Sequence, residues 1–391
     1  MMVNFCGLKL RSPFVVAPGP VTNTITKLRK ADKYGAGAVS TKLTFYRLPF
    51  RGKARYYCEP RHGGLVSSDS RMEYRETVEL VKQAKNETGL VVFCNITHMG
   101  EDIDGWVVMG EALQEAGADA LELNLNCPNI TPAMKQPAGG RVGGFGTLAG
   151  QDKELCQKII TALKKHVSIP IIPKLPYRVA DISEIAQACK DAGADAVTLA
   201  SGYPSLPPVD IYQRGKCLNP FHTGVSVGSW AGDRGSLMHS FANVALVAKR
   251  VGLPIIGGGG IRTWEDGIQM MMWGASVVTA CWLVMYEGFP AIKRVVDGMD
   301  KYMEKQGYGS YQEITGLALP NLRPGTDIEV IPNHARINSA RCNRCHKCIE
   351  IGHCEAISET ADQVIVDAAL CTGCGVCRAL CPRKAVSMVA T

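Results

Sequence analysis

One short pattern recurs four times along the chain and constrains the fold more than any other feature. Each copy is a helix that ends at Gly-Ala, followed after a short step by an apolar strand. The copies are YGAGAVSTKL (34–43), AGADALELNL (116–125), AGADAVTLAS (192–201) and WGASVVTACW (273–282). Their glycines lie 76 to 82 residues apart, a period that corresponds to two strand–helix units.

Four further apolar runs lie between these copies. They are FVVAPG (14–19), VVFCNI (91–96), PIIPKL (170–175) and PIIGGG (254–259). Because strands that alternate with helices form a parallel sheet, eight of them predict a closed (β/α)₈ barrel of the α/β class, a TIM barrel. An open doubly wound sheet is the alternative, but it does not require so regular a period.

The rhythm breaks after residue 317. Segment 318–334 contains three prolines and a glycine, which is typical of a connector. We therefore expect a barrel over 1–317, a linker over 318–334 and a small domain over 335–391. Such a small domain cannot build a large apolar core and depends on bound groups for its stability.

Half of the 16 cysteines lie between residues 342 and 381. The N-terminal segment carries Lys9 and Arg11 where a secretion signal needs apolar residues. No apolar run approaches the roughly 18 residues of a membrane span. We therefore expect a cytoplasmic protein, whose thiols stay reduced and whose clustered cysteines bind metal rather than form disulfides.

The spacing of the last four cysteines matches the bacterial ferredoxin run, in which two residues, two residues and then three residues separate the ligands and a proline follows. A similar run begins the domain, but its fourth cysteine, Cys354, comes two places later than usual, and Glu355 replaces the proline. His353 is a possible competing ligand, and a zinc ribbon is the alternative site. The tail resembles a ferredoxin with two 4Fe–4S clusters, one bound by Cys342, Cys345, Cys348 and Cys381 and the other by Cys371, Cys374, Cys377 and Cys354.

Polar residues end the fourth strand of the predicted barrel. Because side chains alternate along a strand, Glu122, Asn124 and Asn126 point into the barrel when Leu121, Leu123 and Leu125 face the helices. Such buried polar groups are costly unless they bind something. They indicate a ligand site, with an internal hydrogen-bond layer as the alternative.

Two lysines, Lys42 and Lys174, lie on the inward faces of apolar strands. They favour an anionic or electron-rich ligand, such as the edge of a reduced flavin. The glycines at 257–260 follow strand seven, and Thr279 to Trp282 end strand eight. In this fold the loops after strands seven and eight commonly bind phosphate.

NLNCPN (124–129), the two barrel lysines, GGGGI (257–261) and the ferredoxin tail together resemble the dihydroorotate/dihydropyrimidine dehydrogenase family. The likeness extends in particular to the FMN and iron–sulfur subunits of bacterial dihydropyrimidine dehydrogenases. It implies FMN, and Cys127 as the catalytic residue that transfers a proton. The residues that it implies for FMN are Ala17, Lys42, Asn124, Lys174, Gly228, Gly258, Gly259, Gly260, Cys281 and Trp282.

Reduction of an activated C=C bond needs a hydride on one face and a proton on the other. A thiol with a pKa of about 8.5 is mostly protonated at neutral pH and can donate that proton. The resemblance places the substrate against Ser67, Asp69, Asn124, Asn126, Asn129, Ser201 and Gly202.

The chain departs from the family pattern at two of these places. Ser201-Gly202 stands where the family has an Asn-Thr or Asn-Ser pair, and Ser67 stands where it has a second asparagine. These departures leave the identity of the cyclic substrate open. Segment 130–151 is long and glycine-rich, and we expect it to form a lid that brings Lys135 or Arg141 to a carboxylated or larger ring.

The sequence therefore predicts a flavin oxidoreductase that acts on a CH–CH bond of a pyrimidine-like or related cyclic compound. No G-x-G-x-x-G turn is present, so the electron partner is expected to be a separate NAD(P)H/FAD subunit or a ferredoxin, in a homo- or hetero-oligomer. The alternative is an electron-relay subunit without its own substrate; a dihydroorotate dehydrogenase proper is disfavoured by the tail and Ser201. The net charge of +7 is scattered, which favours neither nucleic-acid nor membrane binding.

Overall fold

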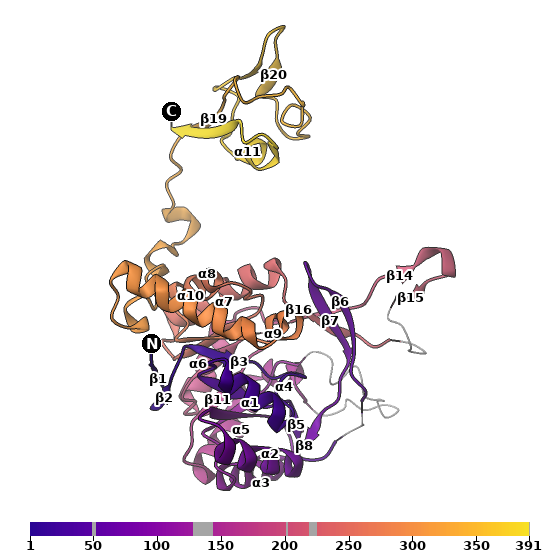
Figure 1. Cartoon of the computed structure of the whole chain (residues 1–391), viewed down its shortest axis with the longest axis vertical. Helices are drawn as coiled ribbons and strands as arrows, with labels where there is room; N and C mark the ends of the chain where they lie inside the picture. Colours follow the sequence, from indigo (N-terminus) through magenta and orange to yellow (C-terminus); the bar gives the residue numbers. More distant parts are fainter. Residues whose placement is uncertain (49–51, 128–143, 201, 219–224, 391) are drawn as a thin grey trace. The chain divides into compact units, whose positions relative to one another are not determined.

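The structure, a computed structural model, describes residues 1–48, 52–127, 144–200, 202–218 and 225–390 (Figure 1). These residues form two compact units, one ending at Leu322 and the other beginning at Arg323. Among the described helices, none combines the length and the apolar composition that a bilayer crossing requires.

The first unit is a closed barrel of eight parallel strands, as the repeat predicts. Each strand pairs with the next, and the eighth pairs with the first, so the sheet has no free edge. In barrel order the strands are β3 (Phe14–Val16), β4 (Ala38–Ser40), β9 (Val91–Thr97), β10 (Ala120–Asn124), β11 (Ile171–Lys174), β12 (Val197–Leu199), β17 (Ile255–Gly258) and β18 (Val277–Ala280).

Helices follow the barrel strands and surround them (Figure 1). They are amphipathic, and their apolar stripes form one core with the outward faces of the strands. The helices are α1 (Ile25–Lys33), α2 (Tyr74–Glu87), α3 (Ile103–Glu115), α4 (Thr147–Gly150), α5 (Lys153–His166), α6 (Ile182–Asp191), α7 (Arg234–Arg250), α8 (Trp264–Met272), α9 (Trp282–Glu287) and α10 (Pro290–Gln306).

A hairpin of β1 (Val3–Phe5) and β2 (Leu8–Leu10) precedes the barrel. Its two-residue turn, Cys6-Gly7, has positive φ at both residues, the geometry that matches the twist of a tight hairpin. Phe5 is buried and packs against Phe93 at the start of β9, with ring centroids 6.3 Å apart. The hairpin therefore contributes its apolar face to the barrel core.

Two excursions from the barrel form a second, antiparallel sheet that helps to build the site. The strands pair in the order β13 (Tyr203–Ser205), β16 (Gly228–Ala231), β7 (Gly63–Ser68) and β6 (Arg55–Glu59). Two short strands, β5 (Thr44–Phe45) and β8 (Met72–Glu73), extend the barrel sheet beside β9. The hairpin of β14 (Val209–Asp210) and β15 (Lys216–Cys217) projects from this unit in Figure 1.

The second unit is small and has two antiparallel ribbons. The first pairs β19 (Asn333–Ile337) with β22 (Val386–Ala390), and the second pairs β20 (Ile357–Glu359) with β21 (Val364–Val366). One short helix, α11 (Val376–Leu380), lies between β21 and β22 in sequence.

Four 3₁₀ turns complete the described elements of the two units: Ile211–Gln213, Tyr311–Glu313, Leu319–Asn321 and Gly325–Asp327.

Candidate active site

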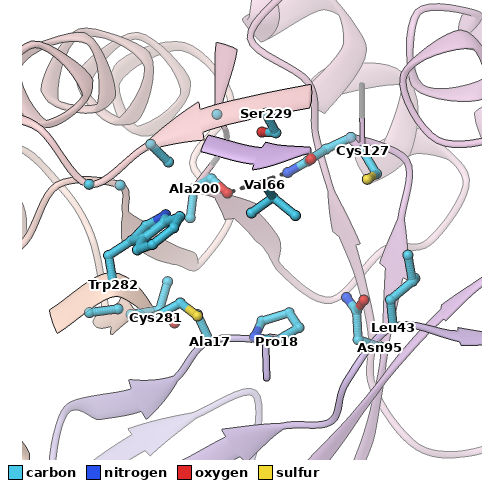
Figure 2. A pocket seen from close by; sticks show the side chains of 18 of the residues that line it. Ala17, Pro18, Leu43, Val66, Asn95, Cys127, Ala200, Ser229, Cys281 and Trp282 are labelled. Carbon is cyan, nitrogen blue, oxygen red and sulfur yellow. Dashed lines mark hydrogen bonds between the residues drawn. The ribbon is translucent and has the colours of Figure 1, made fainter. Parts of the chain in front are cut away.

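A cavity lies at the carboxyl ends of the barrel strands and is roofed by the antiparallel sheet (Figure 2). It contains about 1090 Å³ of space free of protein atoms, part of it open to solvent. Trp282 and Cys281 lie on one side of this space, and Cys127 and Leu43 lie on the other. The cavity can therefore admit a ligand, and its opposite walls carry different chemistry.

Glu122 forms a hydrogen-bond layer below the cavity. Its carboxylate accepts hydrogen bonds from the Ser40 hydroxyl (2.6 Å), the Asn95 amide (2.7 Å) and the Thr198 hydroxyl (2.8 Å). These donors stand on three other barrel strands. The three side chains predicted to point inward therefore have different roles. Glu122, in β10, forms the internal hydrogen-bond layer that was the alternative to a ligand site, whereas Asn124, at the end of β10, and Asn126, which follows it, line the cavity.

Asn124 holds the turn that carries Cys127. Its side-chain oxygen accepts the backbone N–H groups of Cys127 (3.0 Å) and Asn126 (3.4 Å), and its amide donates to Asn95 (3.1 Å). Asn126 donates to the Ala200 carbonyl at the end of β12 (3.3 Å; Figure 2). Two amides thus set the position of the cysteine relative to the strands.

Cys127 itself is half-buried and packs against a small apolar cluster of Leu43, Phe45 and Phe145. Its carbonyl accepts the N–H of Thr147 at the start of α4 (3.3 Å). Residues 147, 149 and 150 are buried, so the end of the segment expected to be a lid, 144–151, is instead packed against the barrel. The rest of that segment, with Lys135 and Arg141, lies outside the described residues.

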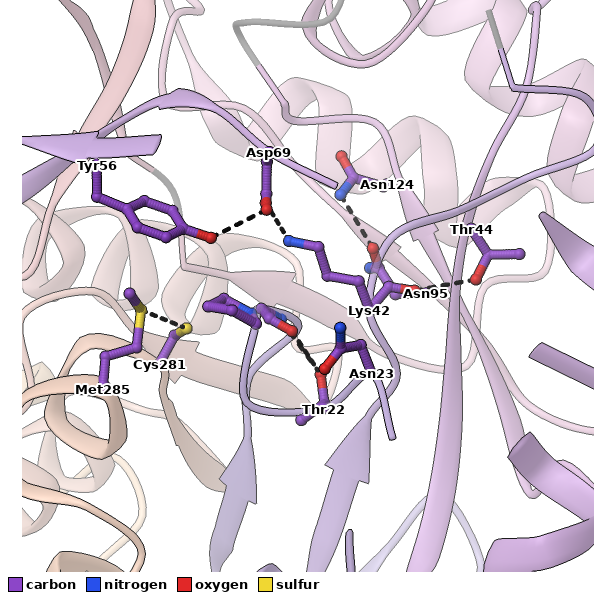
Figure 3. A network of polar contacts seen from close by, with 12 residues as sticks. Thr22, Asn23, Lys42, Thr44, Tyr56, Asp69, Asn95, Asn124, Cys281 and Met285 are labelled. Carbon is purple, nitrogen blue, oxygen red and sulfur yellow. Dashed lines mark hydrogen bonds and ion pairs between the residues drawn. The ribbon is translucent and has the colours of Figure 1, made fainter. Parts of the chain in front are cut away.

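Lys42 follows β4 rather than standing within it, and its ammonium forms a buried ion pair with Asp69 (Figure 3). The Tyr56 hydroxyl donates to the other oxygen of Asp69 (3.0 Å). Burial, with the carboxylate beside it, raises the pKa of Tyr56 well above its usual value, so the phenol stays protonated and keeps donating. Tyr56 and Asp69 both come from the β6–β7 excursion, which therefore supplies one wall of the cavity.

Lys174, at the end of β11, is 8 % exposed and lines the cavity. Within the described residues its ammonium makes no hydrogen bond or ion pair, whereas Lys42 is paired. A buried cation without a counter-charge is costly. The site therefore fits an electron-rich or anionic group beside Lys174, as a flavin provides.

The glycines after β17 leave room for a ligand to approach the backbone. Gly259 and Gly260 line the cavity with φ of +92° and +91°, a conformation that other residues rarely adopt. A β-carbon at Gly260 would lie 2.4 Å from the Asp233 carbonyl, just before α7. On the same wall, burial raises the pKa of Cys281 to about 11, so this thiol stays neutral.

The cavity brings together most of the residues predicted for FMN and substrate. Gly228 and Gly258 do not line it, but each precedes a residue that does, Ser229 and Gly259. Asn129, Ser201 and the side chain of Ser67 lie outside what the structure describes. The predicted residues that line it are Ala17, Lys42, Asp69, Asn124, Asn126, Cys127, Lys174, Gly202, Gly259, Gly260, Cys281 and Trp282.

Sequence reasoning missed several residues of this site. Asn95 interrupts the apolar run of β9, and a polar residue at that position is a usable signal. Tyr56, Val66 and Arg71 also belong to the cavity wall or its hydrogen-bond network. They carried no signal, because only the fold of the β6–β7 excursion brings them to the strand ends.

In the second unit, the four cysteines predicted for one cluster line one pocket, with about 350 Å³ of space free of protein atoms, part of it open to solvent. Cys342, Cys345, Cys348 and Cys381 line it, and the N–H of Ala385 donates to the Cys381 sulfur (3.2 Å). Such N–H groups stabilise thiolates and cluster sulfurs. The residues present therefore fit a 4Fe–4S cluster at this place.

The other predicted group consists of Cys371, Cys374, Cys377 and Cys354. Burial raises the pKa of Cys377, and the neighbouring thiols Cys371, Cys374 and Cys354 raise it further. His353 approaches the Cys374 sulfur at 3.5 Å. No three His, Cys, Asp or Glu side chains of the described residues converge closely enough to hold one metal ion. Support for clusters therefore comes from the order of the donors and from the pocket that they line.

Comparison with known proteins agrees with this geometry. A family model described as dihydroorotate dehydrogenase matches residues 1–303, and one described as a 4Fe-4S binding domain matches residues 364–387. The chain is 28 % identical over 368 residues to the "NAD-dependent dihydropyrimidine dehydrogenase subunit PreA" of Escherichia coli (strain K12), covering 89 % of this chain and 84 % of the relative. It is 30 % identical over 318 residues to the "Dihydroorotate dehydrogenase B (NAD(+)), catalytic subunit" of Pyrococcus abyssi, covering 81 % of this chain and 98 % of the relative.

Proposed function

The chain belongs to the dihydroorotate dehydrogenase family, and from this premise we propose that it is an FMN-dependent enzyme that oxidises or reduces a CH–CH bond of a pyrimidine-like or related cyclic compound. The proposal rests on one observation: Lys174 and Cys127 line the same cavity, and Cys127 lies on the wall opposite Trp282 and Cys281. The cofactor wall of this cavity is formed by Gly259, Gly260 and Trp282.

In this proposal FMN, when bound, supplies or accepts the hydride. The chain holds it with the glycine backbone after β17, with Ala17, Cys281 and Trp282, and with the ammonium of Lys174. A fixed positive charge in a poorly solvated site stabilises negative charge that develops on a bound ring. Lys42 adds less net charge, because Asp69 already balances it.

Cys127 moves the proton. Its thiol lies on the wall opposite Trp282 and Cys281, so a planar substrate between the two walls can exchange a hydride on one face and a proton on the other. Asn124 keeps the thiol in place by binding the Cys127 N–H. General acid or base catalysis of this kind typically contributes about 10²- to 10⁴-fold in rate.

The substrate is proposed to contact Asn124, Asn126, Asp69 and Gly202, with Ser67, Asn129 and Ser201 as further contacts expected from the sequence. A ring with N–H donors suits the carboxylate of Asp69. The hydrogen bond from Tyr56 orients that carboxylate toward the cavity. These polar groups favour a cyclic amide over a purely apolar ring.

The C-terminal unit is proposed to carry two 4Fe–4S clusters, on Cys342, Cys345, Cys348 and Cys381 and on Cys371, Cys374, Cys377 and Cys354. In this arrangement the barrel (1–317) performs the chemistry, and segment 318–334 leads to the cluster domain (335–391). Electrons are exchanged in the cytoplasm with a NAD(P)H/FAD-type subunit or a ferredoxin, within a homo- or hetero-oligomer.

The proposal is tested with the anaerobically purified protein. Dithionite first reduces the flavin. Candidate substrates are then added one at a time: uracil, thymine, orotate and simple cyclic amides. We expect one of these compounds to reoxidise the flavin, with loss of its C=C bond detected by mass spectrometry. A control variant, Cys127→Ala, should bind the same compound without turning it over at a comparable rate.

The competing function is an electron relay without a substrate of its own. It predicts that no cyclic compound reoxidises the flavin and that Cys127→Ala changes nothing. The half-buried position of Cys127, across the cavity from the proposed cofactor wall, favours the enzyme.

A further inference from the structure

Basic and acidic residues occupy separate segments of the C-terminal unit. Residues 336–349 and 378–391 contain seven Lys and Arg and no Asp or Glu, whereas residues 350–377 contain five Asp and Glu and no Lys or Arg. The two basic segments adjoin, because β19 pairs with β22 and the N–H of Asn338 donates to the Ala385 carbonyl (2.8 Å). Positive charge therefore gathers around the first group of cysteines.

Part of this charge is neutralised within the unit. Glu359 accepts from Arg344 (2.6 Å) and lies 2.9 Å from His346. Six exposed cations of the two basic segments form no ion pair with the described residues. Arg336 alternates away from the pocket and Arg378 follows Cys377 of the other cysteine group, so we leave these two out and call the remaining four the basic rim. The basic rim consists of Arg341, Lys347, Arg383 and Lys384.

The basic rim adjoins the cysteine pocket. Lys347 lines the pocket directly, Arg341 precedes Cys342, and Arg383 and Lys384 follow Cys381. Cys345 is exposed on the same pocket. A protein that contacts the basic rim therefore approaches the sulfur ligands closely.

The surface beside the basic rim carries charge but little apolar area. In the described stretches 338–348 and 382–386 no large apolar side chain is exposed. The large apolar side chains that are exposed in this unit are Ile328, Val330, Ile331, Ile365, Leu370 and Leu380, of which only Leu380 is next in sequence to a cysteine of the pocket. Permanent subunit interfaces are rich in apolar side chains, whereas transient redox complexes are small and polar. The surface matches the transient type.

We infer that the basic rim is the docking surface of a small, acidic electron-carrier protein of the ferredoxin type. The inference rests on the proposed function and chooses among its partners. Each docked carrier gives up one electron and is itself oxidised. Two encounters supply the two electrons that reduce one C=C bond, and two protons complete the product.

Charge complementarity is the physical reason for this choice. Four uncompensated cations on one face repel one another, and an acidic face relieves that repulsion on contact. Complementary charge also speeds the encounter, and salt weakens this effect because ions screen exposed charges. A carrier that must leave after each electron benefits from fast association without tight binding.

The experiment compares two charge reversals in the full, cluster-loaded protein. The test variant is Lys347→Glu with Lys384→Glu, and the matched control is Arg336→Glu. In β19, Arg336 points away from Ile337, which lines the pocket, because side chains alternate along a strand. The probe is an acidic plant-type [2Fe–2S] ferredoxin. Binding of its oxidised form is measured by calorimetry, and flavin reduction by its reduced form is measured by stopped flow.

We expect the test variant to weaken ferredoxin binding and slow flavin reduction by about tenfold or more at low ionic strength, and the control to change both by less than about twofold. Added salt should weaken binding to the wild type and largely spare the test variant. Reduction by dithionite should be equal in all three proteins. Equal ferredoxin binding by test and control variants would overturn the inference.

Should the test variant lose its cluster absorbance, the milder Lys347→Gln with Lys384→Gln replaces it, with a smaller loss expected in the same direction. A tight, salt-insensitive complex with a NAD-dependent reductase subunit, unaffected by the test variant, would also overturn the inference. The proposed function is judged separately, because substrate reoxidation of dithionite-reduced flavin needs no carrier.

Discussion

The barrel buries a continuous apolar core that extends from Val3 to Ile314, whereas in the described part of the C-terminal unit the core contains six side chains. One of those six is Cys377, and five more cysteines pack around them. The barrel can therefore fold through burial of its own side chains. The smaller unit has too little apolar area to do so and needs its bound groups.

The same contrast governs the polar groups. In the barrel, buried polar side chains such as Glu122 and Asn124 satisfy one another by hydrogen bonds across strands. In the C-terminal unit, thiols are the buried polar groups, and thiolates near one another repel. Metal binding turns that repulsion into a stabilising contribution. One chain therefore combines a barrel that is stabilised by its own side chains with a small unit that depends on bound groups for its stability.

Removal of iron should have the largest effect, because it should unfold the C-terminal unit and leave the barrel folded. With an iron chelator under anaerobic, reducing conditions, we expect backbone amides of 333–390 to lose their protection against hydrogen exchange, because six buried side chains cannot hold the unit alone. Amides of the barrel strands should keep their protection. Protection retained in 333–390 after complete iron loss would show that the unit folds without clusters.

Replacement of Cys127 by alanine should act on catalysis alone. We expect turnover of the substrate to fall about 10²- to 10⁴-fold, equivalent to roughly 3–5 kcal/mol of barrier, while flavin absorbance and the melting temperature stay close to the wild-type values. Cys217→Ala, on the β15 hairpin, is the matched control. Unchanged steady-state turnover in Cys127→Ala would exclude the proton-transfer role.

Glu122→Leu should destabilise the barrel and leave the C-terminal unit intact. The substitution leaves the Ser40, Asn95 and Thr198 donors without their acceptor, and each unpaired buried donor costs about 1–3 kcal/mol. We expect the free energy of unfolding of the barrel to fall by about 3 kcal/mol or more, measured by urea denaturation. A loss below about 1 kcal/mol would mean that water or the hydroxyls re-pair these groups.

Asp233→Asn should have the smallest effect, and that effect should depend on pH. Asp233 caps α7 by accepting the N–H of Ser236 (2.6 Å), and it also accepts the Trp230 indole N–H (2.8 Å). Burial alone would raise the pKa of Asp233, but the hydrogen bonds from Ser236 and Trp230 outweigh it and lower the pKa. The charged form therefore stabilises the folded barrel above the unfolded pKa of about 3.9.

This contribution is lost as the pH falls through the lowered pKa of the folded state. We expect the variant to be less stable than the wild type by up to about 1 kcal/mol at pH 7, with the difference shrinking in acid. Unfolding free energies of both proteins between pH 3 and pH 7 measure it. A difference that grows in acid would contradict the assigned direction of the pKa shift.

Much of the fold and part of the site followed from local patterns. Alternation along residues 120–126 correctly placed Glu122, Asn124 and Asn126 inside the barrel, because a strand has only two faces. What Glu122 binds was not readable, because its donors lie on strands 27 to 82 residues away in sequence. The role of the β6–β7 excursion was missed for the same reason.

Chain order alone specified the eightfold alternation of strands and helices and the grouping of cysteines in the tail, because both depend on spacing between near neighbours. Folding in three dimensions decided which charges meet: it paired Lys42 with Asp69, left Lys174 without a partner among the described residues, and joined two basic segments around one cysteine pocket. Such encounters depend on how loops return over the barrel and how ribbons pair, and no local periodicity encodes that path.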